Sequence, residues 1–190
     1  MKKTAISLAA GGMMIMTIGC AAVAQEQPAA AAPAASAGGP ALNVALINND
    51  GQPAGSVQLK QGPSGLLMIV EAQGLTPGWH GIHLHATGQC EANFTSAGSH
   101  INHATAAPHG LLNPQGPDLG DLPNIYADAS GVARAELFTD RAALVDGTAG
   151  QNLLDADGSA IVIHANADDH VSQPIGGAGA RVACGIVKAH

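Results

Sequence analysis

Residues 80–85 read His80-Gly81-Ile82-His83-Leu84-His85 and carry the clearest structural signal in the chain. Side chains alternate between the two faces of a β-strand, so His83 and His85 would share one face while the two apolar residues share the other. Two imidazoles side by side over an apolar back are typical of a ligand pair for copper, zinc, nickel or iron. Two surface histidines on an edge strand would give the same pattern. The alternation places His80 on the apolar face, so we predict that it is a structural residue of the core.

Seven further segments have the composition of short strands, separated by Gly, Pro and Asn/Asp turns. They are residues 42–47, 56–60, 66–72, 125–128, 132–138, 160–164 and 181–187. This series, without a convincing helix, predicts an all-β fold, either a sandwich or a barrel. Residues 91–123 have neither a strand nor a helix period. An irregular segment of this length is unusual unless metal ligands or a disulfide hold it.

The first 24 residues have the pattern of an export signal. Met1-Lys2-Lys3 supplies a positive start, and the apolar segment from Ala5 to Ile18 is too short to span a membrane comfortably. Cleavage after Ala22-Val23-Ala24 would release a secreted protein. Alternatively, Thr17-Ile18-Gly19-Cys20 resembles a lipoprotein box in which Cys20 would be acylated. We therefore predict an exported, periplasmic protein, with a lipid anchor through Cys20 as the alternative.

The rest of the chain divides into a linker and one domain. Residues 25–40 are almost entirely Ala, Pro, Gly, Ser and Gln, which cannot bury enough apolar surface to order the backbone, so we expect a flexible linker. Residues 41–190 are long enough to form one folded domain with its own core.

The net charge of the chain limits the kinds of partner that it is expected to bind. The formal net charge is −7, and removal of Lys2 and Lys3 with the signal would make it −9. An acidic chain without a basic run or a phosphate-cradling loop is not expected to bind nucleic acid.

Of three cysteines, Cys20 is either removed or acylated, which leaves Cys90 and Cys184. An even pair in an exported chain predicts a disulfide, two buried free thiols being the alternative.

A series of motifs resembles the bacterial copper/zinc superoxide dismutases. In chain order they are Gly81-Ile82-His83-Leu84-His85, Thr95-Ser96-Ala97-Gly98-Ser99-His100, His109-Gly110, Gly120-Asp121-Leu122-Pro123, His164 followed by Asp168, and Gly179-Ala180-Arg181-Val182-Ala183-Cys184-Gly185. The resemblance covers about residues 42–188. It implies an immunoglobulin-like Greek-key β-sandwich or barrel of about eight strands, with long metal-binding and active-site loops and a disulfide between Cys90 and Cys184.

The resemblance also assigns roles to individual residues. It implies a copper site of His83, His85, His100 and His164 and a zinc site of His100, His109 and Asp121. His100 would bridge the two metals through a deprotonated imidazolate. Asp168 would accept hydrogen bonds from His83 and His109 and so couple the sites. Arg181 would stand beside the copper and dock the anionic substrate, since a guanidinium keeps its charge and suits a small oxyanion.

One position departs from the family pattern, which usually has a histidine nine residues after His109 and three before Asp121. Here that residue is Asp118. Asp118 could itself bind zinc, since a carboxylate oxygen is an ordinary zinc ligand. Alternatively, the zinc site could be weak or empty, with copper working alone, or His103 could take the place of the missing histidine. The first explanation is favoured because the other zinc ligands are intact.

The implied activity is the dismutation of superoxide to oxygen and hydrogen peroxide by a redox-cycling copper beside a zinc, protecting the cell envelope. The alternatives are a copper/zinc-binding protein without significant turnover and a copper-only dismutase. A metal carrier needs neither the anion-docking Arg181 nor the bridging His100, so the enzyme is favoured. His103, His170 and His190 match no ligand position and are expected to be exposed. A monomer and a homodimer are both compatible with the sequence.

Overall fold

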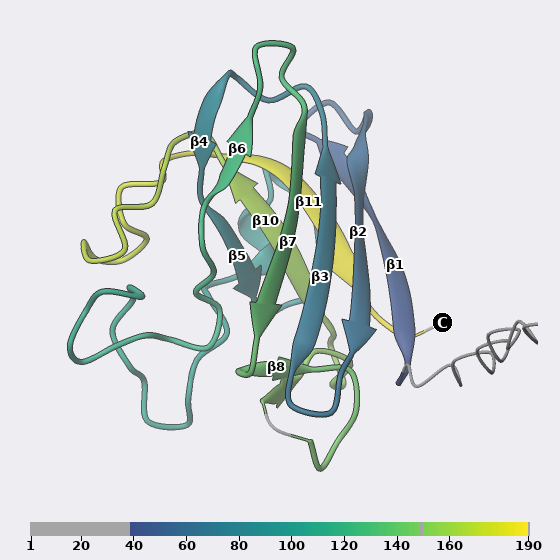
Figure 1. Ribbon diagram of the computed structural model, residues 1–190, viewed down its shortest axis with the longest axis vertical. Coiled ribbons are helices and arrows are strands. Elements are labelled where there is room, and N and C mark those ends of the chain that lie inside the picture. Colours follow the sequence, from purple (N-terminus) through teal and green to yellow (C-terminus); the bar gives the residue numbers. More distant parts are fainter. Residues whose placement is uncertain (1–38, 149, 190) are drawn as a thin grey trace, which may run out of the picture. The chain divides into compact units, whose positions relative to one another are not determined.

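The computed structural model describes residues 39–148 and 150–189, which form an all-β domain (Figure 1). The strands are β1 (Ala41–Asn48), β2 (Pro53–Gln61), β3 (Leu66–Ala72), β4 (Gly78–His80), β5 (Ile82–His85), β6 (Ile125–Ala127), β7 (Ala133–Thr139), β8 (Ala142–Ala143), β9 (Gln151–Asn152), β10 (Ser159–His164) and β11 (Arg181–Val187). The predicted export signal, Cys20 and most of the predicted linker lie outside the described residues. Within the described part of the chain, no helix has the length and apolar character needed to cross a membrane.

Nine strands form one antiparallel sheet in the order β4-β6-β7-β3-β2-β1-β11-β10-β5. The sheet curls on itself, so that β11, β10 and β5 lie behind the layer of β6, β7 and β3 (Figure 1). Strand β3 pairs with β7 and β1 with β11, although neither pair is consecutive in the sequence, and such crossing connections are typical of Greek-key folds. Strands β8 and β9 form a separate parallel pair. The predicted all-β sandwich or barrel is therefore confirmed.

The alternation of buried and exposed side chains explains why these segments form strands. In β3 the side chains of Leu66, Met68 and Val70 are fully buried in the core between the two layers. The turn between β1 and β2 is held by Asn48, whose side-chain oxygen accepts hydrogen bonds from the N–H groups of Asp50 and Gln52 at 3.0 and 2.9 Å. This local bonding is the reason that Asn and Asp favour turns.

Some elements were not predicted. Strands β4, β8 and β9 are only two or three residues long, too short to show an alternation. The irregular segment 91–123 also contains a 3-10 turn, Thr95–Ala97, and forms two isolated bridges that pair His83 with Asp121 and His85 with His100. The segment is therefore attached to strand β5 at two points.

A disulfide joins Cys90, in the loop after β5, to Cys184 in β11, closing a loop with a sequence separation of 94. Cys184 is fully buried, in a small cluster with Phe94 and Val162. The predicted pairing of these cysteines is confirmed. The disulfide fixes the start of the irregular segment to the sheet.

Replacing both cysteines by serine is expected to lower the free energy of unfolding by about 2–5 kcal/mol, because a cross-link over so long a loop restricts the unfolded chain. Denaturant titration of the metal-free protein under oxidising conditions measures this difference. Reduction of the unaltered protein should give the same loss and should leave the double variant unchanged. A loss below about 1 kcal/mol would contradict the expectation.

Candidate metal centre

Strand pairing assembles the first histidine cluster. Strand β5 carries His83 and His85, and it pairs along its length with β10, which ends at His164. The bridge to His85 brings His100 into the same cluster. The rings of His83 and His100 lie 4.2 Å apart between centroids, and those of His83 and His164 lie 4.9 Å apart. All four side chains are buried, so the alternative of two surface histidines on an edge strand is wrong.

Each ring of this cluster keeps one nitrogen without a partner. These atoms are His83 Nδ1, His85 Nε2, His100 Nε2 and His164 Nε2. The four residues can offer one ligand atom each, all within 4.8 Å of one another. A buried polar atom without a hydrogen bond is costly, so four such atoms converging on one point indicate a bound cation. An all-imidazole set suits copper.

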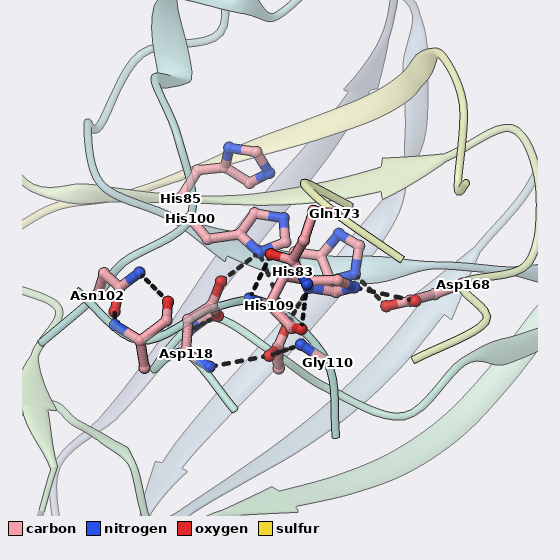
Figure 2. A network of polar contacts seen from close by, with 12 residues as sticks. His83, His85, His100, Asn102, His109, Gly110, Asp118, Asp168 and Gln173 are labelled. Carbon is pink, nitrogen blue, oxygen red and sulfur yellow. Dashed lines mark hydrogen bonds and ion pairs between the residues drawn. The ribbon is translucent and has the colours of Figure 1, made fainter. Parts of the chain in front are cut away.

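A second cluster shares His100 with the first. It is formed by His100, His109, Asp118 and Asp121, again with one candidate ligand atom each within 4.8 Å of the others. Figure 2 shows the side chains of His100, His109 and Asp118 converging there. Two imidazoles and two carboxylates are a competent tetrahedral set for zinc.

Backbone N–H groups orient both carboxylates of the second cluster. Asp118 Oδ1 accepts a hydrogen bond from Gly120 N at 2.9 Å. Asp121 Oδ2 accepts hydrogen bonds from Gly110 N at 2.7 Å and from Asp118 N at 3.0 Å. Asp121 Oδ1 accepts no hydrogen bond from the backbone of the loop and lies in close contact with His109 Nδ1. Each carboxylate therefore has one oxygen held by the loop and the other available to a metal.

Asp168 lies between the two clusters. Its carboxylate accepts hydrogen bonds from His83 Nε2 at 2.8 Å and from His109 Nε2 at 3.1 Å (Figure 2). The side chain of Asn124 holds the backbone of Asp168 in turn, donating to its carbonyl at 2.8 Å and accepting from its N–H at 2.9 Å. One histidine of each cluster is thus oriented by a single, firmly held carboxylate.

Arg181 lines a pocket of about 320 Å³ that reaches His85, His100 and Asp118. Its guanidinium donates to the backbone carbonyls of Phe94 and Gly98, the latter at 2.6 Å. Gly98 also accepts a hydrogen bond from His85 Nδ1 at 3.0 Å. The carbonyl of Gly98 therefore fixes the cationic side chain and a histidine of the first cluster relative to one another.

Burial and hydrogen bonding shift the pKa values of the histidines in the two clusters in opposite directions. Desolvation lowers the pKa of His85 to about 2 and that of His164 to about 4. Burial would also lower the pKa of His109, but hydrogen bonds to Asp121 and Asp168 together raise it to about 10. Burial would raise the pKa values of Asp121 and Asp168, but hydrogen bonds from the histidines hold them well below their usual range.

These pKa shifts predict that the metal-free protein is most stable near pH 6.5, the ordinary histidine value. Below pH 6.5, His85 and His164 become protonated in the unfolded chain but not in the folded chain, so the free energy of unfolding falls as the pH drops towards 4. Above it, only the folded chain keeps the proton on His109, so that contribution is lost as the pH rises towards 10. Denaturant titrations across this range test the expectation, and a monotonic rise in stability from pH 5 to 9 would contradict it.

The structure brings together the residues that the sequence assigns to the two metal sites. The three histidines that were expected to be exposed differ from one another. His103 is exposed, as predicted. The prediction for His170 is wrong, because its side chain is only 19 % exposed and its Nε2 lies 3.2 Å from Asn124 Nδ2. His190 lies outside the described residues. His80 is buried, with its ring nitrogens 2.7 Å from the carbonyls of His164 and Thr76, which confirms its structural role, although it ends β4 and does not belong to the strand of His83 and His85.

Three supporting residues were not predicted from the sequence. Asn124 holds Asp168, Arg141 donates to the carbonyl of Asp121 at 3.1 Å, and Gln173 exchanges two hydrogen bonds with the backbone of His109. Each contacts backbone atoms of a residue that is distant in the sequence. The position of Asn124 directly after the Gly120–Pro123 motif is the one signal that could have identified any of them.

The chain matches known proteins over the segment that carries both clusters. The family model described as copper/zinc superoxide dismutase matches residues 53–187. A copper–zinc superoxide dismutase of Caulobacter vibrioides is 54 % identical over 140 residues, which cover 73 % of this chain and 80 % of that protein.

Solved structures are similar as well. The crystal structure of a superoxide-dismutase-like protein from Bacillus subtilis is 36 % identical, with a TM-score of 0.71, over 76 % of this chain and 97 % of that one. The Cu/Zn superoxide dismutase of Brucella abortus is 27 % identical, with a TM-score of 0.63, over 78 % of this chain and 99 % of that one. With its β-barrel, its paired clusters and these matches, the chain belongs to the copper/zinc superoxide dismutase family.

Proposed function

We propose that this protein converts two superoxide anions and two protons into oxygen and hydrogen peroxide. Copper would be held by His83, His85, His100 and His164, and zinc by His100, His109, Asp118 and Asp121. The observation that supports this best is the pair of buried clusters sharing His100, next to a pocket that contains a fixed arginine. When bound, copper supplies the one-electron oxidation of one superoxide and the one-electron reduction of the next.

Two residues of the chain would bind the substrate and donate a proton to the product. Arg181 holds a permanent positive charge in the pocket and can bind one superoxide anion at a time beside the first cluster. On a protein with a formal charge of −7, such a local cation is needed to attract an anion. His100 is buried and lines the same pocket, and its Nε2, when it is not bound to copper, can hold a proton and give it to the peroxide product.

A copper/zinc-binding protein without turnover is the alternative, and the site does not favour it. Storage or delivery of a metal requires ligands but no anion-binding group. Here Arg181 is held by two carbonyls, one of which also orients His85, so that the cation stands at a fixed position beside the first cluster. A copper-only dismutase remains the second alternative, and it depends on whether Asp118 binds zinc.

The experiment that tests the proposal is the rate of superoxide decay catalysed by the disulfide-intact protein loaded with copper, with and without zinc. Fast decay that improves with zinc is expected and would support Asp118 as a zinc ligand. Fast decay that is indifferent to zinc would keep the dismutase and contradict that role. Bound copper without turnover would instead favour the metal-binding protein.

We also propose that the protein acts outside the cytoplasm, as the export signal predicted over residues 1–24, the disulfide and the family together suggest. Cell fractionation tests this location. Metabolic labelling with a fatty acid, compared between the unaltered chain and Cys20→Ala, distinguishes a lipid anchor from ordinary secretion. Sedimentation analysis distinguishes a monomer from a homodimer.

A further inference from the structure

The tautomers of the histidines in the first cluster are set by oxygens of the chain. Each ring has one nitrogen facing the cluster and the other within hydrogen-bond distance of an oxygen acceptor. The pairs are His83 Nε2 with Asp168 at 2.8 Å, His85 Nδ1 with Gly98 at 3.0 Å, His164 Nδ1 with Gly179 at 3.0 Å, and His100 Nδ1 with Asp118 at 3.0 Å. Because carbonyl and carboxylate oxygens only accept, the outer nitrogen of each ring carries the hydrogen, which leaves the inner nitrogen of the neutral ring with a lone pair for a metal.

His100 is the special case among these four, because its outer nitrogen also faces the second cluster. Asp118 Oδ2 lies 3.0 Å from that nitrogen, and the oxygen of the other carboxylate, Asp121 Oδ1, lies 3.6 Å away, too far for a hydrogen bond. Asp118 is only 3 % exposed, and its other oxygen is held by Gly120 N. The acceptor is therefore fixed in place by the loop itself.

We propose that Asp118 has a second role: when zinc is absent, it orients His100 for copper by accepting the hydrogen on Nδ1. The inference rests on the proposed copper site. In this arrangement all four copper-facing nitrogens are available before zinc binds, so the copper site does not depend on zinc for its geometry. A carboxylate suits this position in both states, since it binds zinc when zinc is present and accepts a hydrogen bond when it is not.

The substitution Asp118→Asn tests this role because it changes the hydrogen-bond pattern with almost no change of shape. Gly120 N–H keeps the amide oxygen on its side, so the amide NH₂ faces His100 and donates to Nδ1. His100 must then carry its hydrogen on Nε2, the atom that faces copper. One of the four copper ligands is lost.

The measurement is made on zinc-free protein with one equivalent of copper(II). Pulsed electron paramagnetic resonance counts the bound imidazoles, and a competing chelator gives the copper affinity. We expect four imidazoles in the unaltered protein and three in Asp118→Asn, with copper affinity about 10–100-fold lower, the usual effect of losing the partner that orients a ligand.

Asp121→Asn is the matched control. It also removes one carboxylate charge from the second cluster, but residue 121 is not hydrogen-bonded to His100 in the metal-free site. Four imidazoles are therefore expected in this variant. Equal losses in the two variants would mean that charge rather than orientation matters, and would overturn the proposal.

Two other results would also overturn it: three imidazoles in the unaltered zinc-free protein, or four with unchanged affinity in Asp118→Asn. The first of these needs no variant, so the test stands even if a variant fails to fold. Superoxide decay by the copper- and zinc-loaded protein is measured separately. Absence of decay would reject the proposed function, while the imidazole count would still decide the role of Asp118.

Discussion

Replacing Arg181 by methionine is expected to lower the rate of superoxide decay by about 10–100-fold, with copper and zinc contents unchanged. The guanidinium is the cation of the pocket beside the first cluster, and a local positive charge raises the concentration and the association rate of a small anion by this order. Methionine keeps a similar side-chain length but has no charge. Stopped-flow measurement of superoxide decay gives the rate.

The matched control for Arg181 is Arg134→Met, which removes the same charge from a side chain that is 72 % exposed on β7. This variant should change the rate little. Arg181→Lys should recover part of the loss, because it restores the charge without the planar pair of donors held by Phe94 and Gly98. If Arg181→Met and Arg134→Met lowered the rate equally, the effect would come from net charge and not from anion docking.

Replacing Asp168 by asparagine is expected to weaken both metal sites, with affinity at one or both falling about 10–100-fold. Asp168 accepts hydrogen bonds from His83 in one cluster and His109 in the other. An asparagine has one acceptor oxygen and one NH₂ donor, so one of the two histidine N–H groups would face a donor and its ring would lose its orientation. Competition titrations with chelators give the two affinities.

The neighbouring Asp169 provides the control for this prediction. Its exposed carboxylate accepts hydrogen bonds from the N–H groups of Val171 and Ser172 and is not bonded to a histidine of either cluster. Asp169→Asn should therefore leave both metal affinities unchanged. Unaltered affinities in Asp168→Asn would show that the two sites do not depend on the shared carboxylate.

The sequence predicted the main strands because these follow from local patterns, and it predicted the disulfide because only two cysteines remain in an exported chain. The alternation around His83 and His85 specifies a strand by the chemistry of adjacent residues, and Cys90 and Cys184 were the only partners left for one another. The resemblance to the family then supplied the roles of single residues. The short strands β4, β8 and β9 were not predicted.

The sequence by itself therefore determined an all-β fold and named the candidate ligands. Only the tertiary structure decided that His83 and His85 are buried rather than on a surface, and that Asp118 is hydrogen-bonded to His100. It also placed Asn124 on the backbone of Asp168, 44 residues away. The physical reason is that alternation depends on neighbours along the chain, whereas these contacts arise only when strand pairing brings distant segments into one buried site.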